Sequence, residues 1–219
     1  MTMISLTAAD GHRLSAWRAG PQNASRALVV VQEIFGVNRH MRHVCDTFAA
    51  QGYAVIAPAL FDRVAPGIEL GYEAADVAQG RELRGKINDG LTVLDILAAA
   101  AALPRGVKRG IVGYCWGGTV AWHGATRTSA FSAASGWYGG GIAAAKGEAP
   151  RCPVQLHFGE TDASIPMADV AAIKAAQPGV EVHVYGGGHG FGCDERGSFV
   201  QADYDLAQKR TLDFFGTHL

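Results

Sequence analysis

Short apolar segments of strand type alternate with helix-like segments along most of this chain. The helical patterns imply helices over 39–51, 74–102, 117–126, 167–176 and 199–217. The strand patterns imply strands over 27–32, 53–57, 109–114, 130–137, 154–158 and 181–185. Such alternation predicts an α/β fold with a central, mostly parallel, twisted sheet that is flanked by helices on both faces.

Two features refine the order of the strands in this sheet. Residues 28–31 are apolar without alternation, which is typical of a strand buried on both faces, so this strand is expected at the centre. Near the N-terminus, the pair Asp10-Gly11 lies between strand-like segments 3–7 and 14–17. An Asp-Gly turn between two strands predicts an N-terminal antiparallel hairpin at a sheet edge.

Composition limits the classes of partner. A chain of 219 residues that is 48% hydrophobic fits one domain over 1–219 with a large core. The 19 Lys and Arg nearly balance the 20 Asp and Glu without blocks of like charge, so a small-molecule partner is expected rather than nucleic acid or a membrane. The first ten residues lack the pattern of a signal peptide, and no apolar stretch reaches membrane-spanning length, so we expect a cytoplasmic protein.

The cysteines and histidines give no sign of a metal site. The four cysteines are widely spread without a C-x-x-C pair, so neither a disulfide framework nor a zinc motif is predicted. His40 and His43 lie one helical turn apart, but no third ligand is evident in the sequence. Neither a metal nor an organic cofactor is therefore expected. Cys193 is the one further cysteine that we expect to line the pocket.

A thiol lies at a turn between a predicted strand and a predicted helix. Residues 113–118 read Gly-Tyr-Cys-Trp-Gly-Gly and follow the apolar residues 110–112. In a nucleophile elbow of the form G-x-nucleophile-x-G, the glycines remove Cβ atoms that would collide at the sharp turn. The turn also presents the nucleophile at a helix N-terminus, where free amides favour a thiolate and can hold an oxyanion. Cys115 is therefore the candidate nucleophile.

A thiol nucleophile requires a base and a group that orients the base. In proteins with this elbow the acid and then the histidine follow the nucleophile along the chain. Asp162 follows the strand predicted over 154–158, and His189 lies in a glycine-rich loop after the strand predicted over 181–185. Asp162 is the candidate acid, with Glu160 as its nearest competitor, and His189 is the candidate base.

Four sequence blocks together resemble the dienelactone hydrolase family, the thiol members of the α/β-hydrolase fold that act on carboxymethylenebutenolide lactones. The resemblance covers nearly the whole chain. The blocks are Gln32-Glu33-Ile34-Phe35-Gly36, Gly113-Tyr114-Cys115-Trp116-Gly117-Gly118, His157-Phe158-Gly159 with Asp162, and Gly188-His189-Gly190-Phe191. Together, in this order, they are highly specific.

The resemblance assigns roles to further residues. It implies a triad of Cys115, Asp162 and His189, and an oxyanion hole made by the backbone N–H groups of Ile34 and Trp116. It also implies that the carboxylate of Glu33 lies near the thiol and helps to ionise it when substrate arrives. A carboxylate beside a neutral thiol is a plausible proton acceptor, and an anionic substrate that displaces Glu33 would trigger the transfer.

The substrate is less well defined than the triad. Family members bind the substrate carboxylate with arginines, one before the elbow and one shortly after the histidine. Here Cys193 occupies the expected later position, so Arg196 is the substitute, while Arg81 or Arg84 is the earlier counterpart, with Arg81 preferred. An arginine fork would select a lactone that carries a carboxylate.

The predicted function is therefore a cysteine hydrolase of lactone or ester bonds, similar to carboxymethylenebutenolidase. A broader carboxylesterase or thioesterase on the same fold is the close alternative, and a redox-sensing thiol or a non-hydrolytic binding module is the more distant one. Phe35, Trp137 and Tyr138 are either pocket walls or core. A monomer and a homodimer both stay open.

Overall fold

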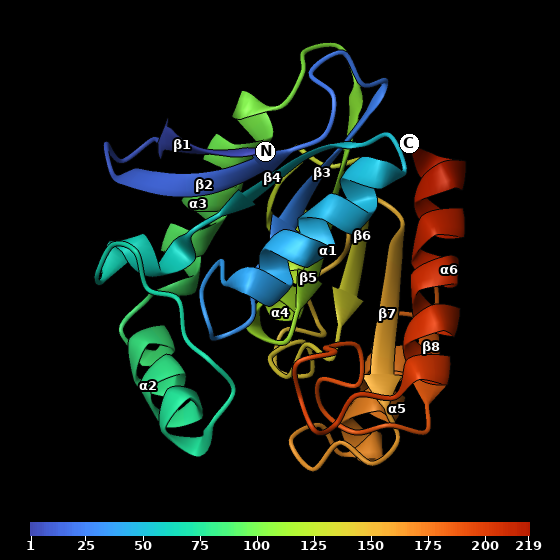
Figure 1. The fold of residues 1–219 in the computed structure, drawn as a ribbon. Helices are drawn as coiled ribbons and strands as arrows, with labels where there is room; N and C mark the ends of the chain where they lie inside the picture. The colour runs from blue at the N-terminus through green and yellow to red at the C-terminus, as the bar shows by residue number, and fades with distance from the viewer.

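A computed structural model describes residues 1–219. Its strands form one sheet of eight in the order β1-β2-β4-β3-β5-β6-β7-β8 (Figure 1). The strands are β1 (Thr2–Thr7), β2 (Arg13–Ala19), β3 (Arg26–Val31), β4 (Ala54–Pro58), β5 (Lys108–Tyr114), β6 (Ala133–Trp137), β7 (Val154–Gly159) and β8 (Glu181–Tyr185). Strand β2 pairs antiparallel with β1 and β4, and every other pair is parallel. The predicted hairpin and the mostly parallel sheet are confirmed.

Helices cover both faces of this sheet, as predicted. They are α1 (Arg39–Ala50), the short 3-10 helix η1 (Leu60–Arg63), α2 (Ala74–Gly85), α3 (Asp89–Ala102), α4 (Trp116–Arg127), α5 (Met167–Ala176) and α6 (Gln201–His218). In Figure 1, α1 and α6 lie in front of the sheet, while α3 and α4 pack together behind it. None of these helices combines the length and apolar character needed to cross a bilayer.

Two predicted elements differ from the structure. The single helix predicted over 74–102 is wrong, because α2 ends at Gly85 and α3 begins only after Asn88. The Asn88 side-chain oxygen accepts a hydrogen bond of 2.7 Å from the Gly90 N–H, which caps a new helix. The strand predicted over 130–137 begins later, at Ala133, because the Ser132 N–H already bonds to the carbonyl of Arg109 outside the β6 ladder.

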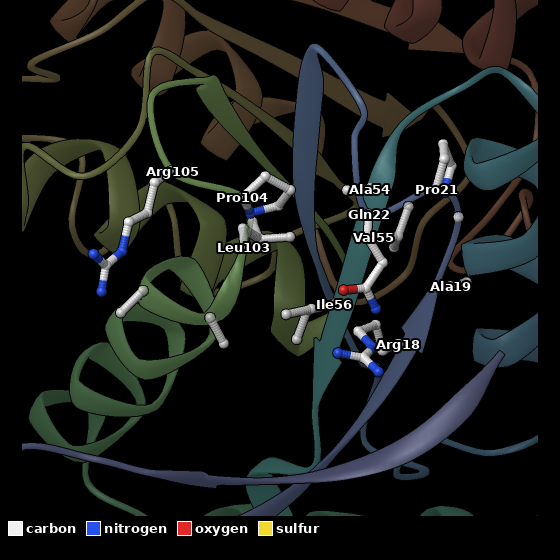
Figure 2. Close-up of a pocket in the computed structure, with 13 residues that line it drawn as sticks. Arg18, Ala19, Pro21, Gln22, Ala54, Val55, Ile56, Leu103, Pro104 and Arg105 are labelled. Atoms are coloured by element: carbon white, nitrogen blue, oxygen red, sulfur yellow. The ribbon is translucent and has the colours of Figure 1, made fainter.

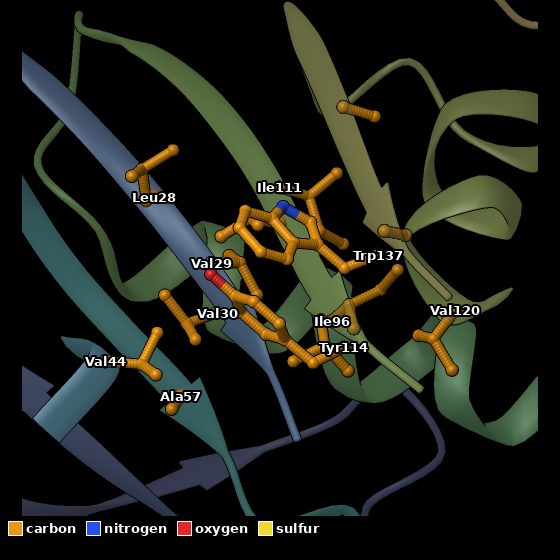
Figure 3. Packing of buried hydrophobic residues seen from close by; sticks show 14 of the residues in the cluster. Leu28, Val29, Val30, Val44, Ala57, Ile96, Ile111, Tyr114, Val120 and Trp137 are labelled. Carbon is orange, nitrogen blue, oxygen red and sulfur yellow. The ribbon is translucent and has the colours of Figure 1, made fainter. Parts of the chain in front are cut away.

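The core lies on both sides of the central strands. Figure 3 shows the side chains of β3 and β5 packed with those of neighbouring helices and strands. Residues 28–31 are fully buried, which agrees with the predicted central position of this strand. Trp137 also lies in this core, and its indole N–H donates to the Thr211 hydroxyl at 3.2 Å. Each large apolar side chain buried here contributes about 1.5–3 kcal/mol.

The parallel strands bring distant parts of the chain to one edge. Strands β3, β5, β7 and β8 run in the same direction, so their carboxyl ends share one edge of the sheet, toward the lower part of Figure 1. The four predicted catalytic residues each lie just beyond one of these ends: Glu33, Cys115, Asp162 and His189. In open α/β sheets, ligands bind at this carboxyl edge.

Candidate active site

The turn from β5 to α4 holds Cys115 in a strained conformation. Its backbone φ of 54° is in the left-handed region, which residues other than glycine rarely adopt. A Cβ on Gly113 would lie 1.9 Å from the Gly117 carbonyl oxygen, and a Cβ on Gly117 would lie 2.4 Å from the Val31 carbonyl oxygen. Only glycine fits at either position, so the steric reason given for the predicted elbow is confirmed.

Cys115, His189 and Asp162 form a continuous chain of contacts. The Cys115 Sγ lies 3.1 Å from His189 Nε2, and His189 Nδ1 lies 2.7 Å from Asp162 Oδ2. The other carboxylate oxygen of Asp162 accepts the Ser164 N–H at 2.8 Å, which fixes the orientation of the carboxylate. The competitor Glu160 is exposed and has no contact with the imidazole. The structure thus brings together the three residues predicted to act as a triad.

The environment of His189 favours its charged form. Burial opposes the charge, but the hydrogen bonds to Asp162 and Cys115 outweigh burial and raise the pKa of His189 to about 10. The side chain of Asp162 is fully buried, so its attraction to the imidazolium is poorly screened. At neutral pH these contacts therefore favour a protonated imidazole beside the sulfur.

Two residues beside Cys115 have backbone amides without a backbone hydrogen-bond partner. Ile34 and Trp116 both line the same hollow as Cys115. Trp116 is the first residue of α4, where an amide has no partner within the helix. The Ile34 N–H also makes no backbone hydrogen bond. These are the two amides that the sequence resemblance assigns to an oxyanion hole.

Glu33 lies near the site but does not contact the thiol. Its carboxylate is fully buried, and its Oε1 lies 3.4 Å from Arg196 Nη1. The guanidinium of Arg196 in turn lies over the ring of Phe35, 5.7 Å from its centroid. Cys115 Sγ lies within hydrogen-bond distance of His189 and makes no hydrogen bond to Glu33.

The three predicted arginines line the hollow but differ in their hydrogen-bond and ion-pair partners. The hollow has a volume of about 340 Å³ and is bordered by Arg81, Arg84 and Arg196. Arg84 is held by Asp89 at 2.7 Å and by the Ile87 carbonyl at 3.0 Å. Arg196 is paired with Glu33. Arg81 is exposed and makes no ion pair, so it is the arginine free to meet an anion.

Several residues around the site had no assigned role. Phe35 lines the hollow, whereas Tyr138 is buried with its ring 5.2 Å from that of His189. Tyr138 also has a positive φ of 39°, which the sequence does not indicate. Cys193 is fully buried and does not border the hollow, contrary to the expectation that it lies in the pocket.

A second hollow lies away from these side chains. Figure 2 shows it between the start of β4, the turn after β2 and the end of α3, with a volume of about 290 Å³. Its polar groups come mainly from Arg18, Gln22 and Arg105. It contains no nucleophile and no histidine, so the chemistry described above is confined to the carboxyl edge of the sheet.

The sheet order and the elbow between β5 and α4 define an α/β-hydrolase fold. A family model described as the dienelactone hydrolase family matches residues 14–219. The chain therefore belongs to the dienelactone hydrolase family, a family of hydrolases of ester and lactone bonds.

Individual relatives agree with this family. The chain is 36% identical over 203 residues to a candidate carboxymethylenebutenolidase of Synechocystis sp., covering 83% of this chain and 82% of that protein. It is 32% identical over 230 residues to a carboxymethylenebutenolidase of Pseudomonas putida, covering 96% and 94%. The crystal structure of a candidate dienelactone hydrolase from Klebsiella pneumoniae superposes with a TM-score of 0.83 at 28% identity, covering 99% of both chains.

Proposed function

We propose that this protein is a cysteine hydrolase of lactone and ester bonds that resembles carboxymethylenebutenolidase. The observation that carries the proposal is the contact chain from Cys115 Sγ to His189 Nε2 at 3.1 Å and from His189 Nδ1 to Asp162 Oδ2 at 2.7 Å. A nucleophile within reach of a base that a third group orients is the geometry required for covalent catalysis.

In the proposed first step, the Cys115 thiolate attacks the carbonyl carbon of the substrate. The negative charge that develops on the carbonyl oxygen is stabilised by the amides of Ile34 and Trp116. When the tetrahedral intermediate collapses, the C–O bond of the ester breaks and its electron pair leaves with the oxygen. His189 can protonate that oxygen, and a lactone ring opens to leave an acyl thioester on Cys115.

In the second step, water attacks the thioester carbonyl. His189 is now neutral and takes a proton from the water, while Asp162 keeps the imidazole oriented and stabilises its charge. The C–S bond breaks and the thiolate returns, paired with the imidazolium. The two steps add one water across the ester bond and need no cofactor.

Glu33 links substrate binding to the state of the thiol in this scheme. Its carboxylate is held by Arg196 at 3.4 Å, so a substrate carboxylate that binds Arg196 competes directly with Glu33. Cys115 borders the hollow beside this pair, so in this scheme the displaced Glu33 carboxylate is a second acceptor for the thiol proton, beside His189.

A broader carboxylesterase or thioesterase is the second candidate. It is favoured by the engagement of Arg84 with Asp89 and of Arg196 with Glu33, which leaves Arg81 as the one unpaired cation of the hollow. A single exposed arginine selects for a substrate carboxylate less strongly than a fork of two.

Steady-state hydrolysis of a dienelactone and of a neutral aryl ester tests both candidates. We expect the dienelactone to have the higher kcat/KM, and Cys115→Ala to remove activity on both substrates. Arg81→Gln should reduce kcat/KM for the anionic dienelactone much more than for the neutral ester. Turnover of the aryl ester alone supports the broader esterase. Activity that survives in Cys115→Ala would contradict both candidates.

A further inference from the structure

Three potential metal ligands converge behind the candidate active site. A carboxylate oxygen of Glu33, a ring nitrogen of His40 and the Sγ of Cys193 all lie within 4.8 Å of one another. Each residue comes from a different segment: the loop after β3, the first turn of α1 and the loop after β8. All three side chains are buried, with 0%, 3% and 0% of their surfaces exposed.

Two polar atoms in this cluster have no partner. Glu33 Oε2 and His40 Nε2 are both buried and make no hydrogen bond. Leaving a buried polar atom unpaired costs about 1–3 kcal/mol, and more for a charged group. Glu33 Oε2 accepts only, so a cation or a donor between these atoms would satisfy the site.

The orientation of His40 is fixed from its other side. His40 Nδ1 lies 2.9 Å from Asp194 Oδ1, and the carboxylate is the natural acceptor for a proton on Nδ1. Nε2, which is buried and unpaired, then carries a lone pair that is available to a metal ion. A carboxylate behind a histidine is the usual support for a histidine that binds a metal ion.

We infer that Glu33, His40 and Cys193 form a binding site for Zn²⁺. Zinc is the common ion that takes one sulfur, one nitrogen and one oxygen ligand in a tetrahedral arrangement. Bonds of about 2.0–2.3 Å place such ligand atoms roughly 3.3–3.8 Å apart. Ligand atoms here lie within 4.8 Å of one another, so side-chain rotations that bring them closer by up to about 1–1.5 Å would complete the site. The fourth position would take a water molecule, as in zinc sites with three protein ligands.

The charges around the cluster balance those of the ion. Two positive charges of Zn²⁺ and one of Arg196 would face three negative charges, on Glu33, Asp194 and the Cys193 thiolate. Zinc deprotonates a thiol that binds it, so the Cys193 proton is released on binding. Arg196 contacts Glu33 Oε1 while the free oxygen is Oε2, so one carboxylate can serve both partners.

Zinc at this site would inhibit the hydrolase, and this consequence rests on the proposed function. An ion bound to Glu33 holds the carboxylate that the proposed mechanism releases toward Cys115. It also neutralises that carboxylate as a proton acceptor. The ion would therefore act without touching the catalytic thiol, which distinguishes this site from simple poisoning of Cys115.

Cobalt spectroscopy tests the site independently of catalysis. Co²⁺ added to the reduced protein should give a cobalt–thiolate charge-transfer band and the intense visible bands of tetrahedral cobalt, both removed by added Zn²⁺. We expect these bands to persist in Cys115→Ala and to disappear in Cys193→Ser. No thiolate band in the wild type, or a band lost in Cys115→Ala but kept in Cys193→Ser, would overturn the proposal.

Zinc affinity, measured by competition with a chromophoric chelator, tests the other ligands. His40→Gln should weaken binding by about 100-fold or more, because a direct ligand is lost, and Asp194→Asn by about 10-fold to 100-fold, because only its support is lost. His43→Ala is the matched control, since His43 lies on the same helix outside the cluster, and its affinity should equal that of the wild type. Equal affinity in His40→Gln and the wild type would overturn the site. Circular dichroism verifies that each variant is folded.

Inhibition is measured separately on the anionic dienelactone, whose carboxylate is the group proposed to displace Glu33 from Arg196. Zinc should inhibit the wild type more strongly than Cys193→Ser, at the same concentration at which it displaces cobalt. Equal inhibition of both proteins would show that zinc acts on Cys115 and would overturn the regulatory role.

Discussion

The pKa of His189 is strongly raised by its neighbours in the site. Its imidazole is positioned between a buried carboxylate and a thiol, with contacts of 2.7 Å and 3.1 Å. These contacts outweigh the burial of the ring, and the pKa of His189 rises from 6.5 to about 10. A change in pKa between the unfolded and folded states makes stability depend on pH.

The direction of that dependence follows from the raised pKa. The folded protein binds the proton of His189 more tightly than the unfolded chain, so this stabilisation is complete below pH 6.5 and is lost as the pH rises through about 10. We expect the difference in unfolding free energy between the wild type and His189→Gln to shrink over this interval. Urea denaturation at several pH values measures it, and a constant difference would contradict the assignment.

Asp162 should matter for catalysis whereas its neighbour Glu160 should not. Asp162→Asn keeps the shape of the side chain but removes the charge that orients and stabilises the imidazolium. We expect kcat to fall by about 10²-fold to 10⁴-fold. Glu160→Gln, which changes an exposed carboxylate two residues away, should leave kcat unchanged. Equal losses in both variants would assign the effect to the loop and not to the triad.

At the scale of single residues, sequence patterns predicted that Cys115, Asp162 and His189 lie together, because each follows a strand whose apolar pattern is clear, and the structure brings them within hydrogen-bond distance. Their catalytic roles stay predictions. The roles of the arginines were harder to predict from the sequence. Their pairing depends on loop conformations and on partners such as Asp89 and Glu33, which no local pattern indicates. The neighbours of His40 were also not predictable from local spacing. The sequence suggested His43 as its partner, whereas the structure places His40 beside Glu33 and Cys193.

At the scale of elements, the elbow depends on close contact between the start of α4 and the end of β3. Gly117→Ala would push a Cβ to within 2.4 Å of the Val31 carbonyl oxygen. We expect a loss of about 1–3 kcal/mol in unfolding free energy, together with reduced activity as Cys115 moves. The matched control is Gly216→Ala in α6, where a Cβ meets nothing within 4 Å, and it should stabilise by about 0.5–1 kcal/mol. Equal effects in denaturant titrations would contradict the steric account.

A buried ion pair joins η1 to α3. Arg63 donates two hydrogen bonds of 2.7 Å to Asp95, whose side chain is fully buried, and one of 2.8 Å to Asp10 in the hairpin turn. Arg63→Met would leave the Asp95 carboxylate buried without a partner, so we expect a loss of about 3–5 kcal/mol in denaturant titration. Lys86→Met, which breaks the exposed pair with Glu82, should cost less than about 1 kcal/mol. A small effect of Arg63→Met would show that water reaches Asp95.

Elements with strong apolar patterns were predicted well and their boundaries less well. The fully buried central strands stand out because both faces are apolar. The break between α2 and α3 was not predicted, because Ala and Leu are frequent on either side of it and favour one continuous helix. The capping residue Asn88 was the local signal that could have located it.

At the scale of the whole molecule, the site assembles only when distant segments pair. Glu33 and Cys115 lie at the same edge of the sheet because β3 pairs with β5, which joins residues 26–31 to residues 108–114. Such nonlocal contacts slow folding, because the entropy of closing long loops must be overcome first. The prediction of one domain over 1–219 and the choice between monomer and homodimer stay predictions.

During refolding, hydrolytic activity should therefore return after the helices have formed. After dilution from denaturant, we expect the helical circular dichroism signal to recover first, and hydrolysis to recover together with the fluorescence of the buried Trp122 and Trp137. Stopped-flow measurements of the three signals test this order. Activity that returns before the tryptophan signal would contradict the dependence of the site on the complete sheet.

The C-terminus lies at the end of the sheet opposite to the site. A Cβ on Gly110, near the start of β5, would lie 3.0 Å from the Leu219 side chain, and Lys108 Nζ donates to the His218 carbonyl at 3.1 Å. Cys115 follows the other end of the same strand, roughly 20 Å away for seven residues. A molecule attached to a solid support through Leu219 would thus present its substrate entrance to the surrounding liquid, and the support would not obstruct the flow of ester to the thiol.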